Sequence, residues 1–170
     1  MLEIWGSASG DPFNGWELRY GVGAAPGQWI RIGEAGESPV ENGQLTAIDS
    51  SQLEDGVYAL RLTVRREGET EDVVYRRFRV DNTPPTVAVT SVVDGETVLP
   101  GPLLIEAEVV DAGGLESVEF RIDGQNIGVV RRAPFAIAWT AVPGEHVLEV
   151  VVFDRAGNTT TSLPIRLSVP

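Results

Sequence analysis

The stretch Asp81-Asn82-Thr83-Pro84-Pro85-Thr86-Val87 lies almost at the midpoint of this 170-residue chain and decides how the sequence divides. Two adjacent prolines remove two backbone donors and fix φ, so this segment is not a central strand. Residues before proline are also pushed toward extended geometry, which favours a short, stiff spacer. We therefore expect a joint between two small domains, residues 1–83 and 84–170.

The residues before the joint form short segments of alternating apolar and polar side chains, separated by turn-rich connections. In the clearest segment Trp16, Leu18 and Tyr20 share one face. Residues 34–43 are expected to form a loop. The spacing predicts seven short strands and no helix in this half, which is the pattern of a β-sandwich.

The residues after the joint repeat this pattern. Val118, Phe120 and Ile122 alternate on the inward face of one segment, and Asp123-Gly124 is a strong hairpin signal. The alternation over residues 103–110 is imperfect. The inward residues expected there are Leu104, Ala107 and Val109 or their neighbours. The fold class predicted for the whole chain is all-β, with two sandwiches in tandem.

Four blocks of the second half resemble a bacterial immunoglobulin-like domain. They are Val118-Glu119-Phe120-Arg121-Ile122-Asp123-Gly124, Ala133-Pro134-Phe135 continuing to Trp139, Pro143-Gly144-Glu145-His146-Val147-Leu148, and Asp154-Arg155-Ala156-Gly157-Asn158. The preceding Asp81 to Pro85 resembles the joint that commonly introduces such repeats.

In the first half, Leu53-Glu54-Asp55-Gly56-Val57-Tyr58-Ala59-Leu60-Arg61-Leu62 resembles the turn and sixth strand of fibronectin type III-like sandwiches. The resemblance implies that Tyr58 pins a corner by hydrogen-bonding back to the backbone. Similar modules follow the catalytic domains of bacterial cell-envelope proteins, including penicillin-binding peptidoglycan synthases and subtilisin-like peptidases.

Charge excludes several classes of partner. The chain has 25 acidic and 13 basic side chains, for a formal net charge of −12, and both halves are acidic. This argues against nucleic acid, whose phosphates need a basic footprint, and against docking on anionic lipid. No apolar run approaches the roughly 20 residues that cross a bilayer, so we expect no membrane insertion by these residues. Met1 to Trp5 lacks signal-peptide features, so we expect Met1 to begin a piece of a longer chain.

Missing residue types exclude several kinds of catalysis. All basic side chains are arginine, and the absence of lysine rules out Schiff-base chemistry and a Walker phosphate loop. The absence of cysteine rules out disulfides and thiolate sites. The single histidine, His146, is expected to be a strand-end residue, because a triad also needs a serine and a carboxylate beside it. The string Gly6-Ser7-Ala8-Ser9-Gly10 superficially resembles a nucleophile elbow, but Ala8 occupies the position where that motif needs serine.

Paired carboxylates are the other catalytic option. Glu106 and Glu108 share one strand face, and Glu67, Glu69 and Glu71 lie near a hairpin tip. Both placements are typical of solvated surfaces. We therefore predict no catalytic, cofactor-binding or metal-binding residue, and expect that the fragment is not an enzyme.

Calcium is the metal for which the sequence offers the most plausible ligands. Asp81 and Asn82 lie at the joint, while Asp111 and Asp154 lie in loops of the second half. A hard cation favours such oxygen ligands and could stiffen a joint. Against this, the EF-hand spacing is absent, and Asp and Asn also cap turns unaided.

Carbohydrate is the binding partner that the aromatic residues suggest. Exposed aromatic platforms are common in sugar sites, and Trp5, Trp16 and Trp29 are dense in the first half. Trp16 is expected in the core because it alternates with Leu18, and Trp139 is expected in the core of the second half. For Trp29 the sequence leaves both positions possible, in the core or on the surface.

A row of arginines raises a related option. If the last two strands of the first half pair, one face carries Arg61, Arg65, Arg77 and Arg79 together with Glu17 and Arg19. The two interpretations are a site for an anionic wall polymer and a solvated ladder of charge pairs. Cross-strand charge pairs of that kind contribute about 0.2–1 kcal/mol each.

The function expected from these patterns is that of a non-catalytic spacer and docking module. It would belong to a larger secreted or envelope-anchored bacterial protein and position that protein's catalytic domain at the cell wall. The alternative is a module that binds peptidoglycan or another glycan, and an enzyme fragment is a more distant one. The expected location is extracellular or in the cell envelope.

Overall fold

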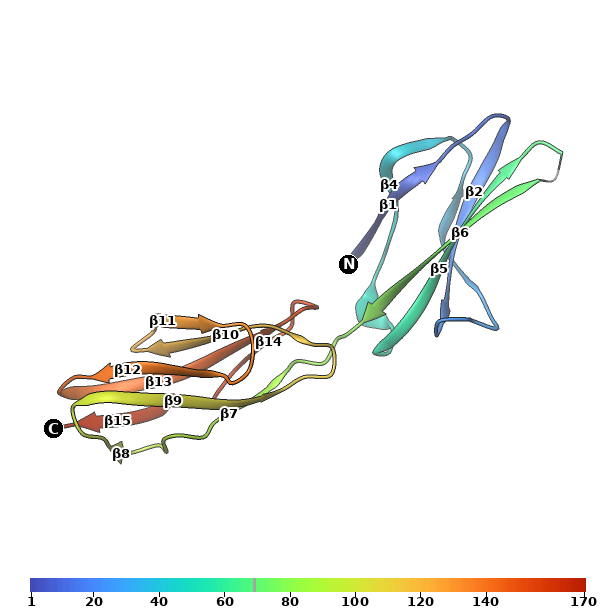
Figure 1. Ribbon diagram of the computed structural model, residues 1–170. Coiled ribbons are helices and arrows are strands. Elements are labelled where there is room, and N and C mark those ends of the chain that lie inside the picture. Colours follow the sequence, from blue (N-terminus) through green and yellow to red (C-terminus); the bar gives the residue numbers. More distant parts are fainter. Residues whose placement is uncertain (69) are drawn as a thin grey trace. The chain divides into compact units, whose positions relative to one another are not determined.

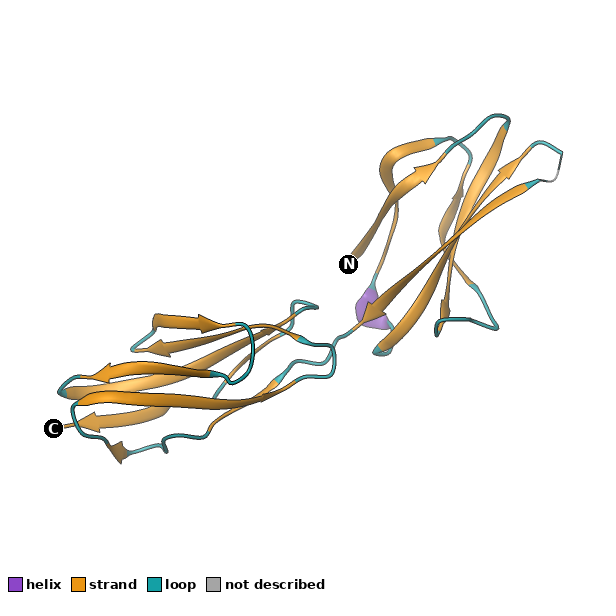
Figure 2. Cartoon of the chain, in the orientation of Figure 1, coloured by secondary structure: helices purple, strands orange, loops and turns teal. Residues whose placement is uncertain are grey.

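The computed structural model describes residues 1–68 and 70–170, which divide into two compact units, Met1–Asn82 and Thr83–Pro170. The boundary lies one residue before the division expected after Thr83. Apart from the short 3-10 helix Ser50–Gln52, the regular secondary structure of the described residues is β-strand (Figure 2). Each unit has its own buried apolar core. The all-β prediction is confirmed.

Unit 1, residues 1–82, is a sandwich of two antiparallel sheets (Figure 1). Its strands are β1 (Leu2–Ala8), β2 (Phe13–Val22), β3 (Ile30–Gly36), β4 (Val40–Ile48), β5 (Gly56–Arg66) and β6 (Glu71–Val80). The larger sheet has the order β3-β2-β5-β6, and the smaller sheet pairs β1 with β4. The described part of unit 1 therefore contains six strands, and the expectation of seven is wrong.

The loop expected over residues 34–43 is also wrong, because β3 continues to Gly36 and β4 begins at Val40. Most side chains in this range are exposed, so neither face shows the apolar alternation that identifies a strand in a sequence. These residues form strands because their backbone pairs with the neighbouring strands β2 and β1. Gly36 is in register with Trp16, and Val40 with Ala8.

The core of unit 1 lies between the two sheets and contains Ala8, Trp16, Leu18, Ile32 and Val64. Trp16 takes the core position predicted for it, and its Nε1 donates to the carbonyl oxygen of Ser38 at 3.2 Å. Gly36 lies directly against the indole, since a Cβ added there would fall 2.1 Å from Cε2 of Trp16. Burial of a large apolar side chain contributes about 1.5–3 kcal/mol.

Tyr58 is buried near the start of β5, and its hydroxyl donates to the carbonyl oxygen of Glu54 at 2.8 Å. Its ring stacks on Phe78 with the centroids 5.4 Å apart. The corner role implied by the resemblance is therefore confirmed. The bond ties the turn before β5 to the strand itself.

Asn82, at the end of unit 1, is tied to the region of the 3-10 helix. Its side-chain Nδ2 donates to the carbonyl oxygens of Ser50 at 3.2 Å and Leu53 at 2.9 Å. Its backbone N–H donates to Oδ1 of Asp55 at 2.6 Å. These three bonds hold Asn82, the last residue of unit 1, within its own unit.

Unit 2, residues 83–170, contains two packed sheets. The strands are β7 (Thr86–Val89), β8 (Glu96–Thr97), β9 (Gly101–Val110), β10 (Leu115–Ile122), β11 (Gln125–Val130), β12 (Ala136–Ala141), β13 (Gly144–Asp154), β14 (Thr159–Thr161) and β15 (Ile165–Val169). One sheet has the order β11-β10-β13-β15-β8, with β14 also paired to β13, and the other has the order β12-β9-β7.

The core of unit 2 includes Val118, Phe120 and Ile122, which all point inward as predicted. Of the expected inward residues of β9, Ala107 and Val109 pack against the core, while at the first position the neighbour Ile105 is fully buried in place of Leu104, which is 54% exposed. The reason is that residues 103–105 are apolar on both faces of the strand, so periodicity does not identify the inner one. The pairing of β9 with β12 decides it.

Candidate binding groove on unit 1

The outer face of the four-stranded sheet carries the arginine row. Arg19 of β2 is in register with Arg61 of β5, which is in register with Tyr75 of β6. Ala59 lies two residues before Arg61 and is in register with Arg77. Alternate residues of a strand share a face. The expected shared face of Arg61, Arg65, Arg77, Arg79, Glu17 and Arg19 is therefore confirmed.

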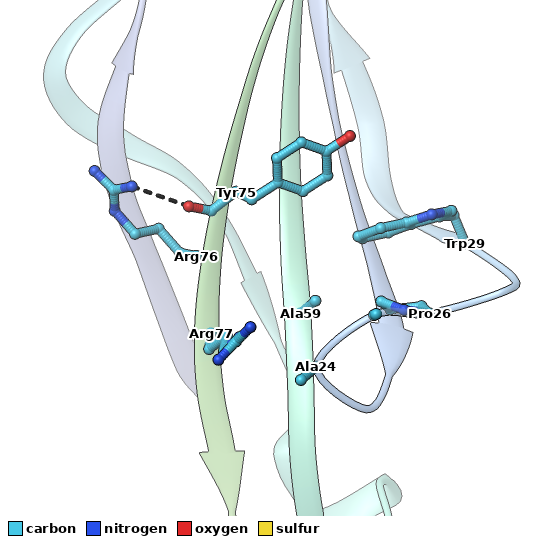
Figure 3. Close-up of a pocket in the computed structure, with 8 residues that line it drawn as sticks. Ala24, Pro26, Trp29, Ala59, Tyr75, Arg76 and Arg77 are labelled. Carbon is cyan, nitrogen blue, oxygen red and sulfur yellow. Dashed lines mark hydrogen bonds between the residues drawn. The ribbon is translucent and has the colours of Figure 1, made fainter.

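A groove of about 690 Å³ lies on this face over Ala59. The connection between β2 and β3 brings Pro26 and Trp29 to one side, and β6 brings Tyr75 and Arg77 to the groove (Figure 3). The side chains of Trp29 and Arg77 lie on opposite sides of β5 in this view. The groove thus has an aromatic wall and a cationic wall.

Small residues make the hollow possible. Ala59 is in register with Gly21 on the neighbouring strand, so the row under the groove has little side-chain volume. Pro26 closes over Gly21, where an added Cβ would lie 2.4 Å from the proline Cβ. Glycine at this position lets the β2–β3 connection fold back and bring Trp29 to the sheet.

The aromatic wall consists of Trp29 and Tyr75. Their ring centroids are 5.9 Å apart and the planes are inclined by 49°. Trp29 is half-buried, whereas Tyr75 is 55% exposed. The guanidinium carbon of Arg61 lies 4.8 Å from the Trp29 ring centroid, in a cation–π contact. This contact orients the indole relative to the sheet.

Two arginines of the row belong to an ion-pair network away from the groove. Glu17 is 6% exposed and contacts Nε of Arg19 at 2.9 Å and Nη2 of Arg65 at 3.1 Å. Arg65 also lies 3.7 Å from Glu71. These residues fit the solvated-ladder interpretation, with one carboxylate buried beneath its partners.

Arg61 and Arg77 differ from that network. No carboxylate in the described residues forms an ion pair with either side chain. Nε of Arg61 is buried and lacks a hydrogen-bond partner among the described residues. A buried donor left unsatisfied costs about 1–3 kcal/mol. Within the predicted row, Arg19 and Arg65 thus have a carboxylate partner, whereas Arg61 and Arg77 have none among the described residues.

Tyr75 was not among the aromatic residues singled out from the sequence. The alternation of Tyr75, Arg77 and Arg79 along one strand indicates that Tyr75 shares a face with these arginines. The register that sets Tyr75 beside Arg61, and the fold of the connection carrying Trp29, come from tertiary pairing.

The remaining tryptophans are placed differently. Trp5 is 62% exposed on β1, and its Nε1 donates to Glu3 at 3.1 Å. Trp139 is partly buried against the core of unit 2, in agreement with its predicted position. Its ring meets His146 edge-on, with the centroids 5.1 Å apart. Trp29 is therefore the tryptophan that lines the groove.

His146 lies in β13, close to its start, as expected. Both ring nitrogens have partners, Nδ1 with Asp123 and Nε2 with the carbonyl oxygen of Val142. No serine hydroxyl contacts the ring within the part of the chain that the structure describes. The geometry is that of a structural histidine.

The carboxylates considered for catalysis are spread over the surface. Glu106 and Glu108 are exposed on β9, and Glu67 is exposed at the tip between β5 and β6. Glu71 contacts Arg65, and Glu69 lies outside the described residues. These positions fit solvated faces. The absence of a catalytic residue stays a prediction.

Two of the residues considered for calcium, Asp111 and Asp154, act as turn caps. In unit 2, Asp111 accepts from the backbone N–H of Gly114, and Asp154 accepts from those of Ala156 and Asn158 at 2.9 and 2.7 Å. A carboxylate oxygen of Asp111 lies within 4.8 Å of one of Asp154. Asp81 and Asn82 belong to unit 1. Calcium binding stays a prediction.

Comparison with known proteins supports the sandwich assignment. Residues 85–150 match the family model of the bacterial Ig domain. The fold of the chain is similar to the fibronectin(III)-like modules of CbhA from Clostridium thermocellum, at a TM-score of 0.54 and 20% identity, covering 99% of this chain and 85% of that one. It is also similar to the FN1-FN3 domains of chicken CNTN1, at a TM-score of 0.52 and 14% identity, covering 96% and 64%. The two units have the fold of immunoglobulin-like and fibronectin III-like sandwiches.

One curated relative is much longer than this chain. The uncharacterized protein YvnB of Bacillus subtilis (strain 168) is 29% identical over 119 residues, which cover 69% of this chain and 8% of that protein. The matched region is thus a small part of YvnB. Among the described residues, none of the helices has the length and apolar character needed to span a membrane.

Proposed function

We propose that residues 1–170 are a non-catalytic spacer and docking module of a larger secreted or envelope-anchored bacterial protein. In this role they position a catalytic domain at the cell wall, and penicillin-binding peptidoglycan synthases and subtilisin-like peptidases are the candidate classes of parent protein. The observation that supports the proposal is the construction from two separately cored sandwiches with a proline pair at the boundary.

The arrangement of the boundary suits a spacer. Asn82 is bonded within unit 1, while the carbonyl oxygen of Thr83 accepts from Asn158 within unit 2 at 3.5 Å. Pro84 and Pro85 follow at once, and β7 begins at Thr86. Few residues are left to absorb a rotation, and prolines have a fixed φ.

A replacement experiment tests the spacer. In the longer protein, residues 1–170 are exchanged for a Gly/Ser linker of equal length. We expect activity on wall-bound substrate to fall while activity on a soluble substrate is retained. Equal activity on both substrates after the exchange would contradict the proposal.

A second function is favoured by the groove on unit 1, namely binding of a peptidoglycan or other glycan chain. The groove combines the exposed face of Tyr75 and the half-buried Trp29 with guanidinium donors. Binding sites for small ligands are concave, mostly apolar surfaces with a few placed polar groups. The groove has this composition.

Retention on purified cell wall tests this second function. The wild-type protein is expected in the wall pellet, and Trp29→Ala is expected to abolish retention. Trp5→Ala is the matched control, because Trp5 is exposed on β1 and does not line this groove. Failure of the wild-type protein to bind any wall fraction would leave the spacer role alone.

A further inference from the structure

We propose that the groove over Ala59 takes a carboxylated sugar, a uronic acid unit of an anionic polysaccharide, with its carboxylate held between Arg61 and Arg77. The sugar ring lies against Trp29 and Tyr75. This inference rests on the proposed glycan-binding function of unit 1 and specifies the charge of its ligand.

The two uncompensated arginines are the first argument. Arg61 and Arg77 lie beside Ala59, one along β5 and the other across on β6. Neither has a carboxylate partner in the described residues. Guanidinium groups bind carboxylates through short, charge-assisted and often bidentate hydrogen bonds. An anionic ligand would give these two side chains the carboxylate partner that they lack.

Local charge is the second argument. The chain has a formal net charge of −12, so it repels polyanions at long range. The groove departs from this balance, because Arg77 lines it and Arg61 contacts its tryptophan, while none of the described residues that line it is acidic. A negative ligand is therefore drawn to this part of the face.

The shape of the groove favours a sugar over an acidic peptide. A peptide that adds a strand to β6 would pair with the backbone along the edge of the sheet. The groove instead opens on the face of the sheet, where the side chains of Ala59, Tyr75 and Arg77 project and backbone groups are already paired with β5. Aromatic walls at this position offer flat surfaces for a ring.

Titration calorimetry with three polymers tests the inference on the intact 170-residue protein. The probes are polygalacturonate, its fully methyl-esterified form, and poly-L-glutamate. We expect polygalacturonate to bind at least about tenfold more tightly than the ester, since the ester lacks the charged acceptor. Binding should weaken as salt is raised.

Substitutions then assign the binding to the groove. Arg61→Gln and Arg77→Gln are each expected to weaken polygalacturonate binding by roughly tenfold, as loss of a charged hydrogen bond predicts. Arg132→Gln is the control, because Arg132 is exposed on unit 2. A thermal melt of each variant checks that the fold is retained.

The outcomes separate this inference from the function on which it rests. Equal binding of polygalacturonate and its ester, lost in Trp29→Ala, would overturn the acidic specificity and leave glycan binding intact. Binding of neither polymer, together with no retention on any wall fraction, would overturn both. Equally tight binding of poly-L-glutamate would overturn the choice of a sugar.

Discussion

The Nδ1 of His146 lies 2.7 Å from Oδ2 of Asp123, and its Nε2 lies 3.0 Å from the carbonyl oxygen of Val142. Both neighbours are acceptors, so both ring nitrogens act best as donors, which is the protonated imidazolium. The bond to Asp123 is the main reason that the pKa of His146 is raised above 6.5. The same bond lowers the pKa of Asp123 below 3.8.

This pair predicts a pH dependence of the stability of unit 2. The contribution of His146, whose pKa is raised, is complete below about 6.5 and is lost as pH rises through the folded-state value. The contribution of Asp123, whose pKa is lowered, is complete above about 3.8 and is lost as pH falls through the folded-state value. We expect the pair to stabilise unit 2 most between these two pH values.

Thermal melts of the wild type and His146→Gln across this pH range measure the effect. The difference in melting temperature is expected to be largest near pH 5 and to shrink toward pH 8. The size should be modest, because the side chain of Asp123 is 48% exposed. Parallel curves over the whole range would show that the pair does not titrate as described.

Tyr58→Phe is expected to destabilise unit 1 by about 0.5–1.5 kcal/mol. The substitution removes the bond to the carbonyl oxygen of Glu54 and keeps the ring that stacks on Phe78. Tyr20→Phe is the control, because the ring of Tyr20 lies next to that of Tyr58 and its hydroxyl has no hydrogen bond to a described residue. Urea denaturation reports both changes. Equal losses in the two variants would argue against a special corner role.

Gly36→Ala is expected to cost unit 1 about 1–3 kcal/mol, the usual range for overpacking a filled core. The new methyl group would lie 2.1 Å from Cε2 of Trp16, whose indole is buried and held by Ser38. Gly27→Ala meets no atom within 4 Å and should be nearly neutral. Tryptophan fluorescence during denaturation measures both. A neutral Gly36→Ala would mean that the indole can shift.

Asn82→Ala is expected to loosen the region around the 3-10 helix by about 1–3 kcal/mol, since two hydrogen bonds to Ser50 and Leu53 are lost. Hydrogen exchange of the amides near residues 50–55 should become faster. Asn14→Ala, at an exposed position of β2, is the matched control. Unchanged exchange in Asn82→Ala would contradict the anchoring role.

Stiffness of the joint is a separate prediction from Pro84 and Pro85. NMR relaxation is expected to give the two units the same apparent tumbling time. Insertion of four Gly-Ser residues after Pro85 should make the two times differ, which supplies the comparison. Different tumbling times in the uninserted protein would contradict the prediction.

Local sequence determined much of the fold. The proline pair removes donors, and the alternation through Val118, Phe120 and Ile122 has the period of a strand with one buried face. Both signals depend on neighbouring residues alone. Where the signal was absent the prediction failed, as in residues 34–43, which are exposed. Around Leu104 both faces are apolar, so the sequence left the inward residue open between neighbours.

The groove required the tertiary structure. Trp29 and Tyr75 are far apart in the chain, and no periodicity within either segment relates one to the other. Strand register brings Tyr75 beside Arg61, and the small Gly21 lets the connection before Trp29 fold over the sheet. The sequence by itself determined which faces of the strands carry arginine. Long-range pairing decided which of those arginines lack a carboxylate, because an ion pair depends on neighbours in space rather than in the chain.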